Sequence, residues 1–408
     1  MKKPELLVPA SSLEVLKTAV RYGADAVYIG GEVFGLRAKA KNFSLEEMKE
    51  GVEFAHRYNV KVYVTANILA HNSDIEPVKA YFNDLKKVKP DALIIADPAI
   101  FTIAKEMLPD MELHISTQAN NTNYGTYNFW HSLGAKRVVS ARELSISEIK
   151  DIRNHIPDDL EIETFVHGAM CISYSGRCLL SSFMAGRDAN KGACTHPCRW
   201  KYAVVEESRP GQYMPVEENE RGTYIFNSKD LCMIDHIPEL VDAGIDSFKI
   251  EGRMKTALYV ATVARTYRMA IDDYFENPKK YEENIPKYKT LISQCTYRQY
   301  TTGFFFGKPD ETTQIYDCNV YERDYVYLGI SGKPLEDGSF VIEQKNKFCV
   351  GDKIEIMKAD GRDIEANVIS ITDQDGVAME SCPHPKQIIT IKLDQVPEAG
   401  DILRMKAE

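Results

Sequence analysis

The sequence lacks any stretch of about 18 apolar residues, which argues against a membrane-spanning helix. Its first apolar run is interrupted by Pro9, so the N-terminus predicts neither a signal peptide nor an anchor. The motifs H-E-x-x-H and G-x-S-x-G are also missing, which argues against a zinc protease and a serine hydrolase. Apolar residues make up 44% and charged residues 27% of the chain, and this excludes a disordered or collagen-like protein.

The nine cysteines are an odd number, and in a chain with no export signal they argue against a disulfide framework. The net charge is −10, so nonspecific coating of nucleic acid is unfavourable, although a local basic face is compatible with it. We therefore expect a cytoplasmic protein with no membrane partner.

Strand-like and helix-like segments alternate over the first 255 residues. The strand-like runs are Leu6–Ala10, Ala26–Ile29, Val62–Ala66, Ala92–Ala96, Leu113–Thr117, Arg137–Ser140, Ile162–Val166 and Ser247–Ile250. Eight such units over about 250 residues favour a (β/α)8 TIM-like barrel over a doubly wound open sheet, because no glycine-rich dinucleotide loop follows the first strand. Gly23, Gly134 and Gly244 each precede a strand and predict left-handed helix ends.

Beyond the barrel, a helix is expected at Ala257–Phe275 and another at residues 284–298. From about Phe304 the pattern changes to short strands between turns, which predicts a small antiparallel β-barrel. We expect two domains, the barrel at residues 1–303 and the C-terminal β-barrel at residues 304–408. Residues 199–226 interrupt the seventh unit as an insertion, at the end of the barrel where active sites lie.

Five cysteines fall within 62 residues, namely Cys171, Cys178, Cys194, Cys198 and Cys232. Thiolates are soft ligands that select zinc, copper(I) or iron–sulfur clusters. The spacings fit a zinc ribbon poorly, whereas an iron–sulfur cluster accepts scattered cysteines. Spacing alone leaves a metal site, a redox dithiol and buried structural thiols as alternatives.

Polar residues at the C-terminal ends of strands are the other candidates. His114, Gln118 and Asn120 lie on or after the fifth strand, His167 ends the seventh, and Glu251 and Arg253 end the eighth. In this fold such positions are typical of catalytic residues, and His167, Glu251 and Arg253 are our catalytic candidates.

A local excess of basic residues surrounds the cysteines, with a net charge of +4 between Cys171 and Lys201. The candidates for binding an anionic substrate are Arg177, Arg187, Arg199 and Lys255. They suit RNA phosphates or the carboxylates of a small acid.

The segment Glu163–Ser181, with His167, Gly168, Cys171, Gly176 and Cys178, resembles the signature of peptidase family U32. Further matches are Arg187-Asp188, Gly192 to Arg199, Asn227 to Cys232, and Lys249 to Lys255. The resemblance runs from Leu6 to about Lys308, and the C-terminal β-barrel is typical of one branch of the family.

The resemblance implies an oxygen-independent hydroxylase with a 4Fe-4S cluster, and Cys171, Cys178, Cys194 and Cys232 match the cluster ligands. Cys198 is an alternative to Cys194, from which it is three residues away. The branch it resembles converts the wobble uridine of tRNA to 5-hydroxyuridine, with prephenate, a small dicarboxylate, implicated as hydroxyl donor. The expected partners are tRNA, the donor, and a paralogous U32 subunit or a second copy of the chain. The alternatives are a U32-type peptidase and a non-catalytic scaffold that carries a cluster.

Overall fold

The computed structural model describes residues 2–31, 42–170, 229–309 and 322–407, together with positions 181, 185, 187, 194, 195, 197, 203, 204, 214, 215 and 313. By packing, the chain divides into two compact units. The first contains Met1–Leu16, Asp25–Met254 and Arg298–Val320, and the second contains Lys17–Ala24, Lys255–Tyr297 and Tyr321–Glu408. None of the helices in the described part of the chain is long and apolar enough to cross a membrane.

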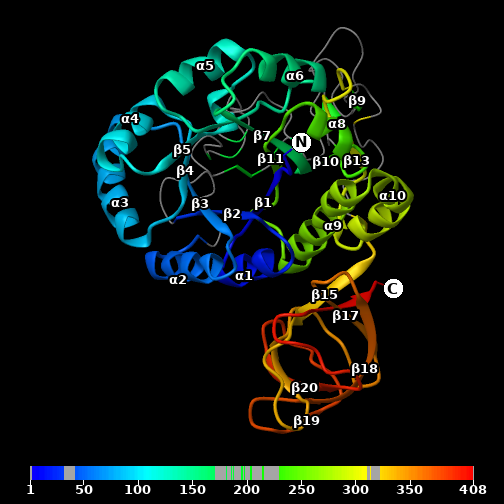
Figure 1. The fold of residues 1–408 in the computed structure, drawn as a ribbon. Coiled ribbons are helices and arrows are strands. Elements are labelled where there is room, and N and C mark those ends of the chain that lie inside the picture. The colour runs from blue at the N-terminus through cyan, green and yellow to red at the C-terminus, as the bar shows by residue number, and fades with distance from the viewer. Residues whose placement is uncertain are drawn as a thin grey trace. The chain divides into compact units, whose positions relative to one another are not determined.

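The first unit is built on a closed ring of parallel strands (Figure 1). In ring order they are β1 (Glu5–Pro9), β2 (Ala26–Gly30), β3 (Lys61–Ala66), β4 (Ala92–Ile95), β5 (Glu112–Ile115), β6 (Arg137–Val139), β7 (Glu161–Ala169) and β11 (Ser247–Ile250). β11 pairs in parallel with both β7 and β1, which closes the ring. The predicted TIM-like barrel is therefore confirmed, with each of its eight strands close to the expected position.

The helices between these strands follow local sequence signals. They are α1 (Leu13–Arg21), α2 (Leu45–His56), α3 (Ile75–Val88), α4 (Pro98–Met107), α5 (Tyr124–Ser132), α6 (Ile146–Asn154) and α8 (Ile237–Asp242), with 3-10 turns at Asn72–Asp74 (η1) and Thr117–Ala119 (η2). Ser44 and Ser145 each form a capping box, which satisfies backbone N–H groups at the starts of α2 and α6. The expected left-handed glycines have φ of 104° at Gly23, 99° at Gly134 and 75° at Gly244.

Two short strands extend the sheet beyond the ring. β10 (Asp230–Cys232) runs antiparallel to the end of β7, and β13 (Tyr300–Thr301) pairs with β10. Within the predicted insertion, the described backbone forms an antiparallel pair, β8 (Ala203–Val204) with β9 (Met214–Pro215). The other residues of 199–226 lie outside the described part of the chain.

The second unit contains two helices, α9 (Ala257–Glu276) and α10 (Pro278–Ile292). The helix expected at residues 284–298 corresponds to α10, which begins and ends earlier in the sequence than predicted. Asn277 caps α10 by accepting a hydrogen bond from the Lys279 N–H, and Pro278 occupies the first turn, where its missing N–H costs nothing. A short antiparallel pair, β12 (Thr296–Tyr297) with β14 (Glu322–Arg323), follows. The domain boundary near residue 303 stays a prediction. In the division by packing, α9 and α10 belong to the same unit as the C-terminal sheet.

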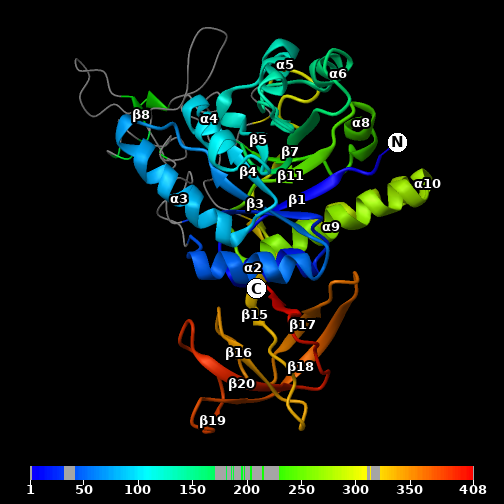
Figure 2. The ribbon, with the colours of Figure 1, turned by 60° about the vertical axis from the view of Figure 1, so that its left-hand side comes forward.

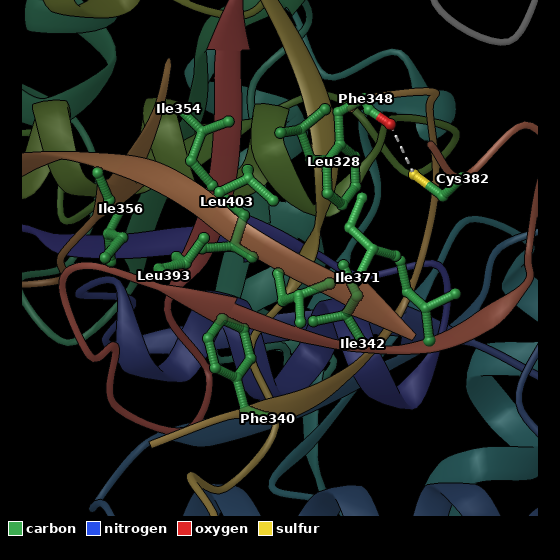
Figure 3. Close-up of a cluster of buried hydrophobic side chains, with 14 residues drawn as sticks. Leu328, Phe340, Ile342, Phe348, Ile354, Ile356, Ile371, Cys382, Leu393 and Leu403 are labelled. Atoms are coloured by element: carbon green, nitrogen blue, oxygen red, sulfur yellow. Dashed lines mark hydrogen bonds between the residues drawn. The ribbon is translucent and has the colours of Figure 1, made fainter. Parts of the chain in front are cut away.

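The C-terminal strands of the second unit form one antiparallel sheet that curls around its own core (Figure 2). Their order is β15 (Tyr325–Ile330), β21 (Ile402–Lys406), β17 (Lys353–Met357), β18 (Asp363–Thr372), β20 (Ile388–Leu393) and β16 (Phe340–Glu343), and β19 (Ala378–Met379) pairs with β18. Side chains such as Phe340, Ile356, Ile371 and Leu403 meet inside this sheet (Figure 3). The Cys382 thiol, also inside, donates to the Phe348 carbonyl at 3.3 Å.

Charged side chains connect α9 to this sheet within the second unit. The Arg265 guanidinium donates to Asp363 Oδ1 at 2.7 Å, and Arg404 Nη2 donates to Asp363 Oδ2 at 3.0 Å. Both arginines are almost fully buried, and Glu355 also accepts from Arg404. Buried charges of this kind are tolerated because each is paired and hydrogen-bonded.

Leu403→Ala tests the core of the C-terminal sheet. Leu403 is fully buried, so we expect the free energy of unfolding to fall by about 2–5 kcal/mol. Chemical denaturation followed by circular dichroism measures this loss. Val396→Ala is the control, since Val396 is 58% exposed and its truncation should change stability by less than about 0.5 kcal/mol. Equal stability of Leu403→Ala and the wild type would contradict the described core.

Candidate active site at the C-terminal rim of the barrel

Three of the predicted residues lie on neighbouring strands of the first unit, with His167 on β7, Cys232 on β10 and Glu251 just after β11. Cys232 lies directly opposite His167 in the β7–β10 pair, so the two side chains lie on the same face of the sheet. Glu251 follows β11, and its backbone N–H donates to the His167 carbonyl at 2.8 Å. The rim therefore places an imidazole, a thiol and a carboxylate on adjoining strand ends.

Gly168 makes this close approach possible. Its φ is 105°, in the left-handed region, and a Cβ at this position would lie 2.4 Å from the Glu251 carbonyl oxygen. A larger residue would therefore have to displace the backbone of the neighbouring strand end. This is the physical reason for a glycine directly after His167.

An arginine that sequence analysis missed holds Glu251 in place. Arg142, just after β6, donates through Nη1 to the Ala169 carbonyl at 2.9 Å. Its Nη2 lies 3.4 Å from Glu251 Oε2, and its guanidinium lies 3.9 Å above the Phe165 ring. The signal was available, because Arg142 follows a strand end in the same way as Glu251 and Arg253.

Arg253 reaches across the rim in the other direction. Its Nη1 donates to Thr65 Oγ1 at the end of β3 with a length of 2.7 Å, and the side chain is buried. Gly30, at the end of β2, gives it room, since a Cβ there would lie 2.7 Å from Arg253 Nη1. Arg253 is thus part of the inner rim rather than of an open surface.

Beneath the rim, the barrel is filled by a network of paired charges at the N-terminal ends of the strands. Arg137 of β6 lies 2.6 Å from Glu5 of β1, 2.6 Å from Glu161 and 3.0 Å from Glu163 of β7. Lys249 of β11 bonds to Glu163 at 2.6 Å. In this fold, residues at the N-terminal end of the barrel serve stability rather than chemistry.

The network sets the protonation of its members. Burial alone would raise the pKa of Glu5, but the Arg137 guanidinium and the Tyr63 hydroxyl lower it to about 2. Burial would likewise raise the pKa of Glu163, and Lys249 and Arg137 lower it below its usual value. Burial lowers the pKa of His114, whose ring lies edge-on to Tyr63 inside the barrel. His114 therefore belongs to the interior and not to the rim.

Two family models match most of the chain. The model of peptidase family U32 matches residues 11–315, and the model of the peptidase family U32 C-terminal domain matches residues 323–404. The chain belongs to peptidase family U32.

Three relatives show which members of the U32 family this chain is similar to. The chain is 40% identical to the tRNA hydroxylation protein P1 of Bacillus subtilis over 99% of this chain and 95% of the relative. It is 37% identical to the tRNA hydroxylation protein P of Escherichia coli over 100% of this chain and 97% of the relative. It is also 39% identical to the 23S rRNA 5-hydroxycytidine synthase of Escherichia coli, over 67% of this chain and 40% of the relative.

The remaining U32 signature residues are only partly described. Cys171, Cys178, Cys198, Arg177 and Arg199 lie outside the described residues. Cys194 is exposed and Cys232 is buried. In the described part of the chain, no group of three or more metal-binding side chains comes together. The cluster assignment therefore stays a prediction.

Two of the predicted basic residues, Arg187 and Lys255, lie in the described part of the chain. Arg187 is exposed, and its backbone N–H donates to the Ser181 carbonyl at 3.2 Å. Lys255 belongs to the second unit, where its ammonium donates to the Thr296 carbonyl at 3.4 Å and lies 4.8 Å above the Tyr259 ring. Their role in binding an anion stays a prediction.

Glu5→Gln tests the charge network of the U32 barrel. At neutral pH we expect a loss of about 1.5–3 kcal/mol, because charge-assisted hydrogen bonds to Arg137 are removed. The folded pKa of Glu5 is about 2 against an ordinary value of 4.5, so its contribution exists above pH 4.5 and is lost as the pH falls toward 2. The difference in stability between wild type and variant should therefore shrink over this window in pH-dependent denaturation. A difference that stays constant down to pH 2 would contradict the pairing.

Proposed function

We propose that this chain hydroxylates uridine in tRNA to 5-hydroxyuridine, at the wobble position, with a bound 4Fe-4S cluster and without molecular oxygen. The observation that carries the proposal is the identity of 37–40%, over at least 95% of each chain, with two relatives named tRNA hydroxylation proteins. The similarity to a relative named as an rRNA 5-hydroxycytidine synthase supports the broader class of RNA hydroxylation.

The proposed reaction exchanges a hydroxyl for a hydrogen. Carbon 5 of the uracil ring loses a hydrogen and gains a hydroxyl, so the base is oxidised by two electrons. A donor acid of the prephenate type loses its hydroxyl and gains a hydrogen, and is reduced by two electrons. The exchange balances without oxygen gas and without a further reductant.

The residues at the rim suit an iron–sulfur cluster. Thiolates are the ligands of such clusters, and the buried Cys232 lies at the rim on the same face as His167. Cys171, Cys178 and Cys194 would supply the other ligands, with Cys198 as the alternative to Cys194. When bound, the cluster would supply one-electron transfer.

The protein's own side chains have separate tasks in this proposal. Imidazole and carboxylate groups exchange protons near neutral pH, so His167 and Glu251 would hold or move the proton that leaves the uracil ring. Arg142 would hold Glu251 in its orientation. Arg253 lies at the inner rim, where a guanidinium matches a carboxylate in a bidentate manner.

Arg177, Arg187, Arg199 and Lys255 would bind phosphates of the RNA or further carboxylates of the donor. A tRNA substrate places the proposed reaction in the cytoplasm. A paralogous U32 subunit or a second copy of this chain remains part of the proposal as a partner.

The first test concerns the cluster. Protein purified without air should contain about four iron and four sulfide per chain, the composition of this cluster type. Serine at Cys171, Cys178, Cys194 or Cys232 should lower both contents sharply, because a thiolate ligand is lost. Cys349→Ser is the matched control and should retain full iron, since Cys349 lies in the C-terminal sheet unit. Full iron in all four variants, or zinc alone in the wild type, would refute the assignment.

The second test concerns the product. In a strain that lacks this gene and any paralogue, mass spectrometry of tRNA nucleosides should show no 5-hydroxyuridine derivatives. The wild-type gene should restore them, and Cys232→Ser should not. Restoration by Cys232→Ser would mean that the reaction does not need the cluster. Unchanged tRNA in the deletion strain, together with gelatin cleavage by the purified protein, would favour the peptidase alternative.

A further inference from the structure

A cluster of neutral amide side chains lies at the rim beside Arg253 and plays no part in the mechanism above. Asn67 follows β3, while Gln118 and Asn120 follow β5, and we call these three residues the amide cluster. Thr65 and Asn67 are two residues apart at the strand end, so the amide cluster adjoins the threonine that binds Arg253.

Hydrogen bonds to Ser116 hold the cluster together. The Ser116 hydroxyl accepts from Asn67 Nδ2 at 3.2 Å and from the Gln118 backbone N–H at 3.4 Å. The Ser116 carbonyl accepts from Asn121 Nδ2, which also donates to the Val139 carbonyl and so ties the end of β5 to β6. The Asn67 amide is therefore held at the end of β5, and Asn121 joins the ends of β5 and β6.

The side-chain carbonyl oxygens of these amides all lack a hydrogen-bond donor among the described residues. Asn67 Oδ1, Gln118 Oε1 and Asn120 Oδ1 are buried from solvent, and none has a hydrogen-bond partner among the described residues. A buried acceptor without a hydrogen-bond partner is unfavourable, because it has lost its bonds to water. Three of them within one strand-end cluster point to a ligand that donates hydrogen bonds.

The chemistry of the cluster selects the kind of ligand. Phosphates and carboxylates offer only acceptors, so they would meet the amide oxygens unfavourably. A uracil base offers an imide N–H between two carbonyl groups. A single amide side chain matches this edge twice, because its oxygen accepts from the imide and its nitrogen donates to a ring carbonyl.

We propose that Gln118 and Asn120 of the amide cluster read the imide edge of the uracil base that is hydroxylated, with Asn67 accepting a further donor of the nucleoside. This inference rests on the proposed function and names the site that selects its base. Asn120 has a φ of 58°, a left-handed backbone conformation, and the Asn67 amide is held by Ser116. The base then lies on the amide side of the rim, and the anionic donor lies toward Arg142 and Arg253.

The test compares two anticodon stem-loop RNAs that differ in one base. One carries uridine at the target position, and the other carries 3-methyluridine, in which a methyl group replaces the imide hydrogen. Fluorescence anisotropy without air measures binding to each. We expect the wild type to bind the uridine RNA at least about tenfold more tightly, which corresponds to about 1.4 kcal/mol.

Two variants remove the amides with little other change. Gln118→Met keeps the side-chain length, and Asn120→Gly keeps the left-handed backbone. In both, the ratio of the two affinities should fall to about one, mainly through weaker binding of the uridine RNA. Gln395→Met is the matched control, since Gln395 is exposed in the C-terminal sheet unit, and it should keep the wild-type ratio. Iron content and thermal unfolding should be equal in all three variants.

The outcomes separate the two proposals. Hydroxylation of the uridine RNA with equal affinity for both RNAs would overturn the base-reading role and leave the proposed function intact. The same holds if the variants keep the wild-type ratio. A wild type that neither binds nor hydroxylates the uridine RNA would overturn both.

Discussion

The buried pairing of Arg137 with glutamates on other strands is the constraint on which the barrel depends. Arg137 of β6 contacts Glu5 across the barrel and Glu161 and Glu163 on the adjoining strand. A guanidinium in this interior is tolerable only with its full set of partners, so the strands can close in one register. Lys249 extends the same pairing to β11, the strand that completes the ring.

The charge network at the N-terminal ends of the strands helps to set the positions of the residues at the rim. Lys249 and Glu163 join β11 to β7, and the pairing shifts by one residue between Lys249 and Ile250. With that shift, the backbones of Glu251 and His167 meet at the rim. The backbone contact at Gly168 and the Arg142–Glu251 pair depend on this register. At the rim, Arg142 lies beside Glu251, and Arg253 lies on Thr65 next to the amides that include Asn67.

The sequence predicted those parts of the molecule that depend on local signals. Eight strands and the glycine-ended helices followed from periodicity and turn chemistry, and the strand-end rule found His167 and Glu251. Arg142 was missed although it follows a strand end, and Asn67 was missed because its contact with Ser116 joins strands far apart in sequence. The limits of α10 were misjudged, since Asn277 and Pro278 start it earlier than its apolar pattern indicates. The predicted cluster ligands came only from the family resemblance, and two of the four, Cys171 and Cys178, lie outside the described residues.

The most direct measurement of the central claim is the reaction itself with oxygen gas excluded. Purified protein is incubated with tRNA from the deletion strain and prephenate, and the tRNA nucleosides are then analysed by mass spectrometry. The account predicts that uridine gains one oxygen atom with the wild type and none with Cys232→Ser. Formation of 5-hydroxyuridine only after oxygen gas is admitted, or equally without protein, would contradict it.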